Sequence, residues 1–200
     1  MMTPQTKRKR SDEDEQELEF ASLFKIYTET NPGKTHHIYL SESVESNHGY
    51  AKLCHFLRST EPRDHTIIYL SNHGGSCASG YQLINAVRQS PGMVHMAVDA
   101  PCYSMGALLA VAGDSLHMNP NTLLMFHNYS GGSGGKGREM LDLALQHDVW
   151  LQGAVKNTAY PFLSRKELAD IAEDKDVYVH WDDPTLKDRI KRQFKTTERK

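Results

Sequence analysis

Short runs of β-branched and aromatic residues alternate with amphipathic stretches from about residue 36 onward, and this alternation constrains the fold most strongly. Strand patterns occur at 36–40, 66–70 and 94–98, and apolar residues recur at helical spacing after each of the first two. A strand, a helix and a further strand in this order form a βαβ unit, whose strands lie parallel in one sheet. The sequence therefore predicts an α/β fold with a mostly parallel sheet.

The second half of the chain continues the alternation and adds one long helix. An apolar run rich in small residues, SMGALLAVAG at 104–113, predicts a helix that is almost wholly buried. Ser164 and Glu167 have the spacing of a capping box at the start of another helix. The other predicted elements are strands at 115–118 and 123–126, a flexible SGGSGG hinge at 130–135 and a long helix from Arg138 to about Tyr160.

Length and charge divide the chain into one domain and two polar ends. Two hundred residues suit a single hydrophobic core, and the net charge is only −2. Residues 187–200 hold seven cations and two anions, whereas the N-terminal end mixes cations with an acidic block. We therefore predict a flexible charged arm at 1–30, one domain at 31–185 and a basic tail at 186–200.

Several classes of protein are disfavoured by composition. No apolar run reaches the ~20 residues that a membrane-spanning helix needs, and an acidic block stands where a secretory signal needs apolar residues, so we expect a cytoplasmic chain. That block also screens the KRKR run at 7–10, which we interpret as a solvated arm and not as a nucleic-acid patch. Cys54, Cys77 and Cys102 form no CxxC pair, and the histidines show no metal-binding spacing, so no disulfide, metal or cofactor is expected.

A nucleophilic serine is the chemistry that the predicted elements favour. Ser104 falls between a buried strand and a buried helix, where amide groups at the helix start can meet an oxyanion. A glycine turn at 73–76 could add a donor, and His127, at the end of a strand, could serve as the general base. The carboxyl ends of parallel strands meet at one edge of a sheet, so these segments can converge. The carboxylate that would orient the histidine stays open among Asp170, Glu173, Asp174 and Asp176.

Three motifs, taken together and in this order, resemble the ClpP family, the proteolytic subunit of the Clp protease. They are YLSNHGGSCASG at 69–80, YSMGA at 103–107 and MFH at 125–127, and the likeness runs from about Ile38 to Tyr178. The family's acid lies in a Glu-Arg-Asp-Arg-Phe segment after a long handle helix. The DKDVY segment of this chain matches it, so the resemblance selects Asp176 among the four acids.

The resemblance implies a fold and a set of site residues. The fold would be a ClpP/crotonase-like spiral of ββα units, with residues 138–160 as a protruding handle helix. Ser104 would be the nucleophile, His127 the base and Asp176 its orienting acid. The oxyanion hole would consist of the amides of Gly75 and Met105, and substrate would add as a strand along Gly131, Gly132, Ser133 and Gly134.

The resemblance also implies an activity and partners. The chain would be a serine endopeptidase that acts on proteins or peptides inside a chamber of heptameric rings, stacked in pairs through their handles. Because the sequence contains no Walker A loop, ATP-dependent degradation would need a separate AAA+ unfoldase, and sister ClpP subunits are further expected partners. Neither a membrane nor a nucleic acid is expected as a partner.

Some residues depart from the family pattern and leave alternatives open. Tyr103 replaces a small residue beside the nucleophile, His73 replaces the proline of the turn, and the segment after Asp176 differs from the family's ending. These departures suggest a divergent member, a specialised paralogue or a phage-encoded version. The alternative functions are a non-catalytic ring subunit and a crotonase-like acyl-CoA enzyme.

Overall fold

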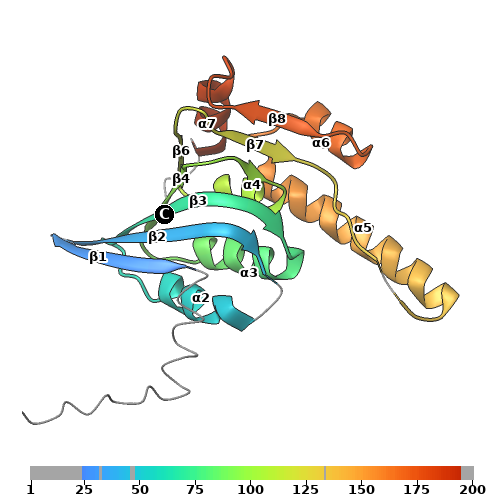
Figure 1. Cartoon of the computed structure of the whole chain (residues 1–200), viewed down its shortest axis with the longest axis horizontal. Helices are drawn as coiled ribbons and strands as arrows, with labels where there is room; N and C mark the ends of the chain where they lie inside the picture. The colour runs from blue at the N-terminus through green and yellow to red at the C-terminus, as the bar shows by residue number, and fades with distance from the viewer. Residues whose placement is uncertain (1–23, 32, 46–47, 133, 195–200) are drawn as a thin grey trace, which may run out of the picture.

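The computed structural model describes residues 24–31, 33–45, 48–132 and 134–194 as an α/β fold with two sheets (Figure 1). The larger sheet has five strands in the order β1-β2-β3-β4-β6, and every neighbouring pair in it is parallel except β1 with β2. Its strands are β1 (Lys25–Asn31), β2 (Gly33–Val44), β3 (His65–Gly75), β4 (Met93–Val98) and β6 (Ser115–Met118). The parallel sheet predicted from the alternating pattern is therefore present.

The smaller sheet has three strands in the order β5-β7-β8. They are β5 (Cys102–Tyr103), β7 (Leu123–Phe126) and β8 (Val177–His180). Strand β5 is parallel to β7, whereas β8 is antiparallel to it and comes from a part of the chain about fifty residues away. The smaller sheet thus joins three segments that are distant in sequence.

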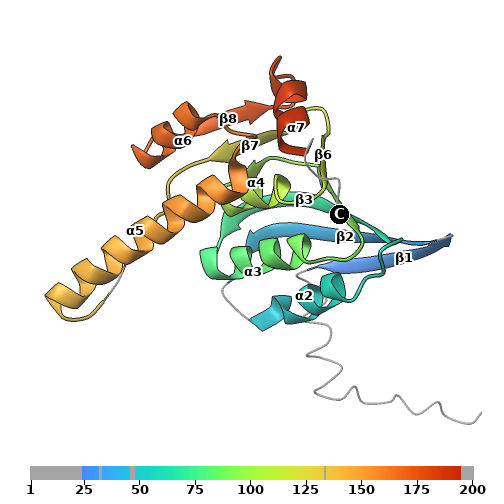
Figure 2. The same ribbon diagram turned by 180° about the vertical axis from the view of Figure 1, so that it is seen from behind.

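Helices cover the sheets and account for most of the remaining chain. Helices α2 and α3 lie against one face of the larger sheet, and α6, α7 and the smaller sheet form the opposite end of the molecule (Figure 2). The helical elements are η1 (His48–Tyr50), α2 (Ala51–Arg58), α3 (Cys77–Arg88), α4 (Met105–Ala110), α5 (Gly137–Ala159), α6 (Arg165–Ala172) and α7 (Leu186–Phe194). None of the helices that the structure describes has the length and apolar character needed to cross a bilayer.

The core lies between the larger sheet and the helices packed on it. Alternate residues of β2 and β3 are buried because successive side chains of a strand point to opposite faces. Every residue of α4 is buried, as its small apolar sequence predicts. Ile38, Leu70 and Met96 are among the side chains that this packing excludes from water almost completely.

Helix α5 leaves the body of the molecule and agrees closely with the handle expected at 138–160. Only Leu151, Thr158 and Ala159 of its 23 residues are buried, and the helix projects outward in both views (Figures 1 and 2). Large apolar side chains are nevertheless exposed along it, with Val149 at 71% and Leu141 at 60%. This helix therefore presents apolar surface that the residues described by the structure do not cover.

Ordered structure extends into both ends that the sequence assigns to polar tails. Strand β1 overlaps the expected arm 1–30 from Lys25 onward, where it pairs antiparallel with β2 and packs Ile26 against the core. Helix α7 lies within the expected tail 186–200, and its residues Leu186 and Ile190 pack against the core. The KRKR run at 7–10 lies outside the described residues.

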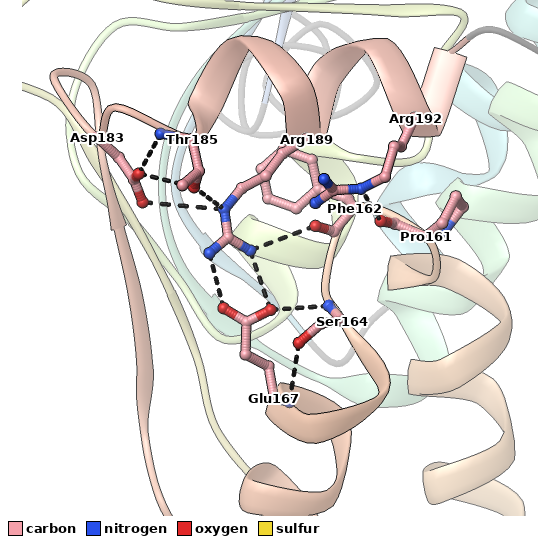
Figure 3. A network of polar contacts seen from close by, with 8 residues as sticks. All are labelled: Pro161, Phe162, Ser164, Glu167, Asp183, Thr185, Arg189 and Arg192. Atoms are coloured by element: carbon pink, nitrogen blue, oxygen red, sulfur yellow. Dashed lines mark hydrogen bonds and ion pairs between the residues drawn. The ribbon is translucent and has the colours of Figure 1, made fainter.

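A polar cluster fixes the C-terminal elements to each other (Figure 3). Arg189 on α7 donates from both terminal nitrogens to Glu167 on α6, at 2.7 and 3.0 Å. Arg189 Nη1 also donates to the Phe162 carbonyl oxygen at 3.3 Å, and its Nε lies 3.8 Å from the Asp183 carboxylate. Glu167 completes the capping box predicted with Ser164. Because β8 lies between α6 and α7 in the chain, this cluster also restrains β8.

Candidate active site

Ser104 occupies a tight connection between β5 and α4. Its backbone has φ 56° and ψ −123°, a left-handed conformation that is uncommon for a residue with a side chain. Its N–H donates to the Met125 carbonyl oxygen of β7 at 2.8 Å, which ties the connection to the neighbouring strand. Strained residues of this kind concentrate at functional sites, and a strained strand-to-helix turn also carries the nucleophilic serine of α/β-hydrolases.

A glycine at the end of β3 makes room for this connection. Gly74 has φ +91°, and a Cβ atom there would lie 2.6 Å from Ser104 Cβ and 3.1 Å from the Met105 nitrogen. Its N–H donates to Oδ1 of the fully buried Asn72 at 2.9 Å. Only glycine fits this position, because a side chain would collide with the serine and also strain the backbone.

The two expected oxyanion donors lie on the segments that meet at this point. Met105 is the first residue of α4, and the first amides of a helix have no partner within it. Gly75 ends β3, and a Cβ atom there would lie against the Val44 backbone. The glycine turn expected at 73–76 is in fact the end of β3, because pairing with β2 continues to Gly75.

His127 directly follows β7 and is partly exposed. Strand β5 pairs with β7 so that Tyr103 lies beside Met125. Ser104 and His127 therefore leave neighbouring strands at the same end of the smaller sheet.

Asp176 directly precedes β8, and its position follows from the register of the smaller sheet. Phe126 pairs with Val177 in antiparallel register, so continuing that register by one residue puts Asp176 across from His127. The Asp176 side chain is exposed, and its Oδ2 accepts a hydrogen bond from the Tyr178 hydroxyl at 3.2 Å. Within the described ranges, no hydrogen bond joins the side chains of Ser104, His127 and Asp176 to one another.

The other three candidate acids form hydrogen bonds with residues other than His127. The Lys175 ammonium bonds to Asp170 at 3.0 Å and to Glu173 at 2.8 Å. Asp174 accepts from the Asn128 amide at 2.8 Å. Of the four acids that the residue pattern left open, Asp176 is thus the one set opposite the histidine by strand pairing.

Sequence reasoning missed three residues that shape this region: Asn72, Asn128 and Tyr178. Asn72 supports Gly74, and Asn128 links the end of β7 to the turn before β8. The Asp176 carboxylate, together with partial desolvation, raises the pKa of the Tyr178 hydroxyl that donates to it. Asn72 and Tyr178 each bond to a residue two positions away in the chain, whereas the Asn128 contact joins two distant segments. No sequence pattern marks any of the three contacts.

Cys102 is a second potential nucleophile close to Ser104, and its surroundings make it unreactive. The side chain is fully buried. Burial raises the pKa of the thiol to about 11, although a hydrogen bond with the Asn72 backbone opposes the change. The reactive thiolate form is therefore scarce at neutral pH, and the serine stays the stronger candidate.

The expected substrate segment is open in this structure. Gly131, Gly132 and Gly134 are exposed, and a Cβ atom at any of them would meet no other atom within 4 Å. Ser133, the fourth residue of the segment, lies outside the described residues.

A cavity of about 730 Å³ lies between the second half of α5 and helix α6. Its edge reaches Asn128, the residue after His127, and the cations Lys156 and Arg165 are part of its wall. Apolar residues such as Val149 and Leu168 line the rest. In the part of the chain that the structure describes, no group of three or more histidine, cysteine or acidic side chains could hold a metal ion.

These features define an α/β protein in which a strained serine, a histidine and a carboxylate lie at the same end of a small sheet, in a chain with a protruding helix. The family model for Clp protease matches residues 23–174, three quarters of the chain. The chain belongs to the Clp protease family, which confirms the resemblance drawn from its three motifs and the expected fold class. Membership places it among peptidases of a family that generally forms oligomeric rings. The match ends two residues before Asp176.

Proposed function

We propose that the chain is a serine endopeptidase of the Clp type, with Ser104 as nucleophile, His127 as general base and Asp176 as the acid that orients the histidine. One observation carries the proposal: a serine at φ 56° leaves β5 beside the end of β7, where His127 follows and Asp176 lies opposite in register. A serine hydroxyl needs an adjacent base, and the base needs an orienting group. Ser104 lies on the β5 side of His127 and Asp176 on the β8 side, which is the order that a nucleophile, a base and an orienting acid require.

The proposed reaction proceeds through an acyl-enzyme. Ser104 Oγ attacks the carbonyl carbon of the peptide bond while His127 takes the hydroxyl proton, and the amides of Gly75 and Met105 stabilise the oxyanion. His127 then gives that proton to the leaving amine as the C–N bond breaks. A water molecule, deprotonated by His127, attacks the acyl carbon and releases the carboxylic acid and the serine.

Assembly and substrate delivery are part of the same proposal. The exposed apolar face of α5 supports stacking of two heptameric rings into a tetradecamer through their handles, which would enclose the sites in a chamber. Substrate would add as a strand along residues 131–134. Folded substrates would need an AAA+ unfoldase, sister ClpP subunits are further candidate partners, and the proposed location is the cytoplasm.

Labelling with a fluorophosphonate tests the nucleophile. Wild-type protein should gain one adduct by intact mass, and Ser104→Ala should gain none. Ser115→Ala is the matched control, because Ser115 also bonds to a histidine, with its Oγ 2.8 Å from His95 Nδ1, but lies on the larger sheet. Labelling that persists in Ser104→Ala would contradict the assignment, as would unlabelled wild-type protein in an intact ring by native mass.

A non-catalytic ring subunit is the second candidate, and one observation favours it. The Asp176 carboxylate bonds to Tyr178 and not to His127 in the single chain. A vestigial site predicts rings of normal size that bind peptides but neither react with the fluorophosphonate nor cleave. Assembled wild-type rings that turn over peptide would exclude it.

A further inference from the structure

Two rows of side chains lie next to each other on the exposed face of the smaller sheet. In the first row, Tyr103, Met125 and Tyr178 are direct neighbours across β5, β7 and β8. His127 and Asp176 form the second row. His127 follows Met125 by two residues and Asp176 precedes Tyr178 by two, so both lie toward the same end of the sheet. Because side chains two residues apart along a strand point to the same face, Tyr178 and Asp176 share a face with His127.

We propose that Tyr178 is a positioning residue, whose hydroxyl holds one oxygen of Asp176 so that the other oxygen is directed to His127. The observed bond runs from the Tyr178 hydroxyl to Oδ2 of Asp176 at 3.2 Å. This inference rests on the proposed function, since it assigns Asp176 the orienting role. Tyr178 itself touches neither the nucleophile nor the scissile bond in this scheme.

Asp176 needs such a restraint because it is exposed at the edge of the molecule. A carboxylate in solvent rotates freely, and an orienting acid works only when one oxygen keeps a fixed direction. The adjacent cation, Lys175, does not supply the restraint, because its ammonium bonds to Asp170 and Glu173. Tyr178 is therefore the donor that the described part of the chain offers to Asp176.

Tyr178 is suited to this task by its stiffness and its protonation. Its ring has only two rotatable bonds, and its backbone lies in the ladder between β8 and β7. A phenol keeps its proton at neutral pH and stays a donor, and the neighbouring Asp176 carboxylate raises the pKa of this one further. The Tyr178 hydroxyl is thus held in position and stays protonated.

The variant Tyr178→Phe tests the proposal because it removes only the hydroxyl from a side chain that is 52% exposed. The matched control is Tyr27→Phe, a similar change at 54% exposure on β1 of the other sheet. We expect kcat for a fluorogenic peptide to fall about tenfold in Tyr178→Phe, the size of a hydrogen bond to a charged group. KM should change less than about twofold and the melting temperature should stay that of wild type, because substrate binding and packing are untouched.

A double-mutant cycle separates positioning from a structural role. In an Asp176→Asn background, adding Tyr178→Phe should leave the rate of fluorophosphonate labelling at Ser104 unchanged, because the acid that Tyr178 positions is gone. An equal tenfold fall of the labelling rate in the wild-type and Asp176→Asn backgrounds would overturn the proposal. A wild-type kcat in Tyr178→Phe would overturn it as well. Absence of labelling at Ser104 in wild-type protein would instead refute the proposed function, so the two failures are distinguishable.

Discussion

Asp176 differs from the acids around it by position and not by charge. Asp170 and Glu173 share the Lys175 ammonium, and Asp174 bonds to Asn128. The antiparallel pairing of β7 with β8 directs only Asp176 to the residue across from His127. At the scale of single residues, the proposed function therefore depends on one carboxylate that strand register singles out.

We predict that Asp176→Asn lowers kcat by about 10⁴, the loss seen when the orienting acid of a serine protease becomes an amide. The physical reason is that an amide no longer stabilises the imidazolium and favours the wrong tautomer of the histidine. Peptide turnover measures the effect, and thermal unfolding should be unchanged because the side chain is exposed.

Asp174→Asn is the control for this prediction, because it changes the neighbouring acid. Asparagine tolerates the φ of 60° that Asp174 adopts, so the turn should keep its shape. We expect nearly wild-type turnover for it. A loss for Asp174→Asn as large as that for Asp176→Asn would show that strand register does not identify the orienting acid.

At the scale of elements, the bond between Glu167 of α6 and Arg189 of α7 joins the two helices that precede and follow β8 in the chain. Burial would by itself raise the pKa of the Glu167 carboxyl, but the hydrogen bonds from Arg189 and Ser164 outweigh it and lower the pKa to about 2. A depressed pKa means that the charged form stabilises the folded state. The contribution is complete above the ordinary value of 4.5 and is lost as the pH falls from there toward 2.

We predict that Glu167→Gln lowers the free energy of unfolding by about 2 kcal/mol at neutral pH and flattens the fall of stability between pH 4.5 and 2. Denaturant unfolding at a series of pH values measures both effects. Glu173→Gln is the matched control, because its bond to Lys175 is exposed and such pairs contribute little. A Glu167→Gln variant with the same acid dependence as wild type would disprove the role of this bond.

At the scale of the whole molecule, α5 exposes apolar side chains that the described part of the chain leaves uncovered. Leu141, Leu145, Val149 and Trp150 are each at least 48% exposed. Exposed apolar surface of this kind marks an interface. Since proteins of this family generally form rings, we propose this helix as the contact between two of them.

We predict that Val149→Asp separates stacked rings into single rings, because each subunit then adds a charge to an apolar contact. Native mass spectrometry measures the assembly, and the far-ultraviolet spectrum should show an intact fold because Val149 is 71% exposed. Gln146→Asp is the control, since it adds the same charge to an exposed polar position of the same helix. Unchanged stacking in Val149→Asp would place the ring contact elsewhere.

The sequence by itself was informative wherever the signal was local. The alternation of strand and helix patterns predicted the parallel sheet, and the small apolar run after Ser104 predicted the buried helix α4. The Ser164 and Glu167 spacing predicted a capping box that the structure contains. Each of these features depends on hydrogen bonds or side-chain periodicity within a few residues, which a sequence displays directly.

Only the tertiary structure decided which distant segments meet. Strand β8 has four residues and no distinctive pattern, and its pairing with β7 selects the acid that lies opposite His127. The close approach of Gly74 to Ser104 and the bond from Asn128 to Asp174 likewise join groups that are distant in the chain. The physical reason is that register and packing are set by the summed hydrogen bonds and burial of many residues, so no single stretch of sequence encodes them.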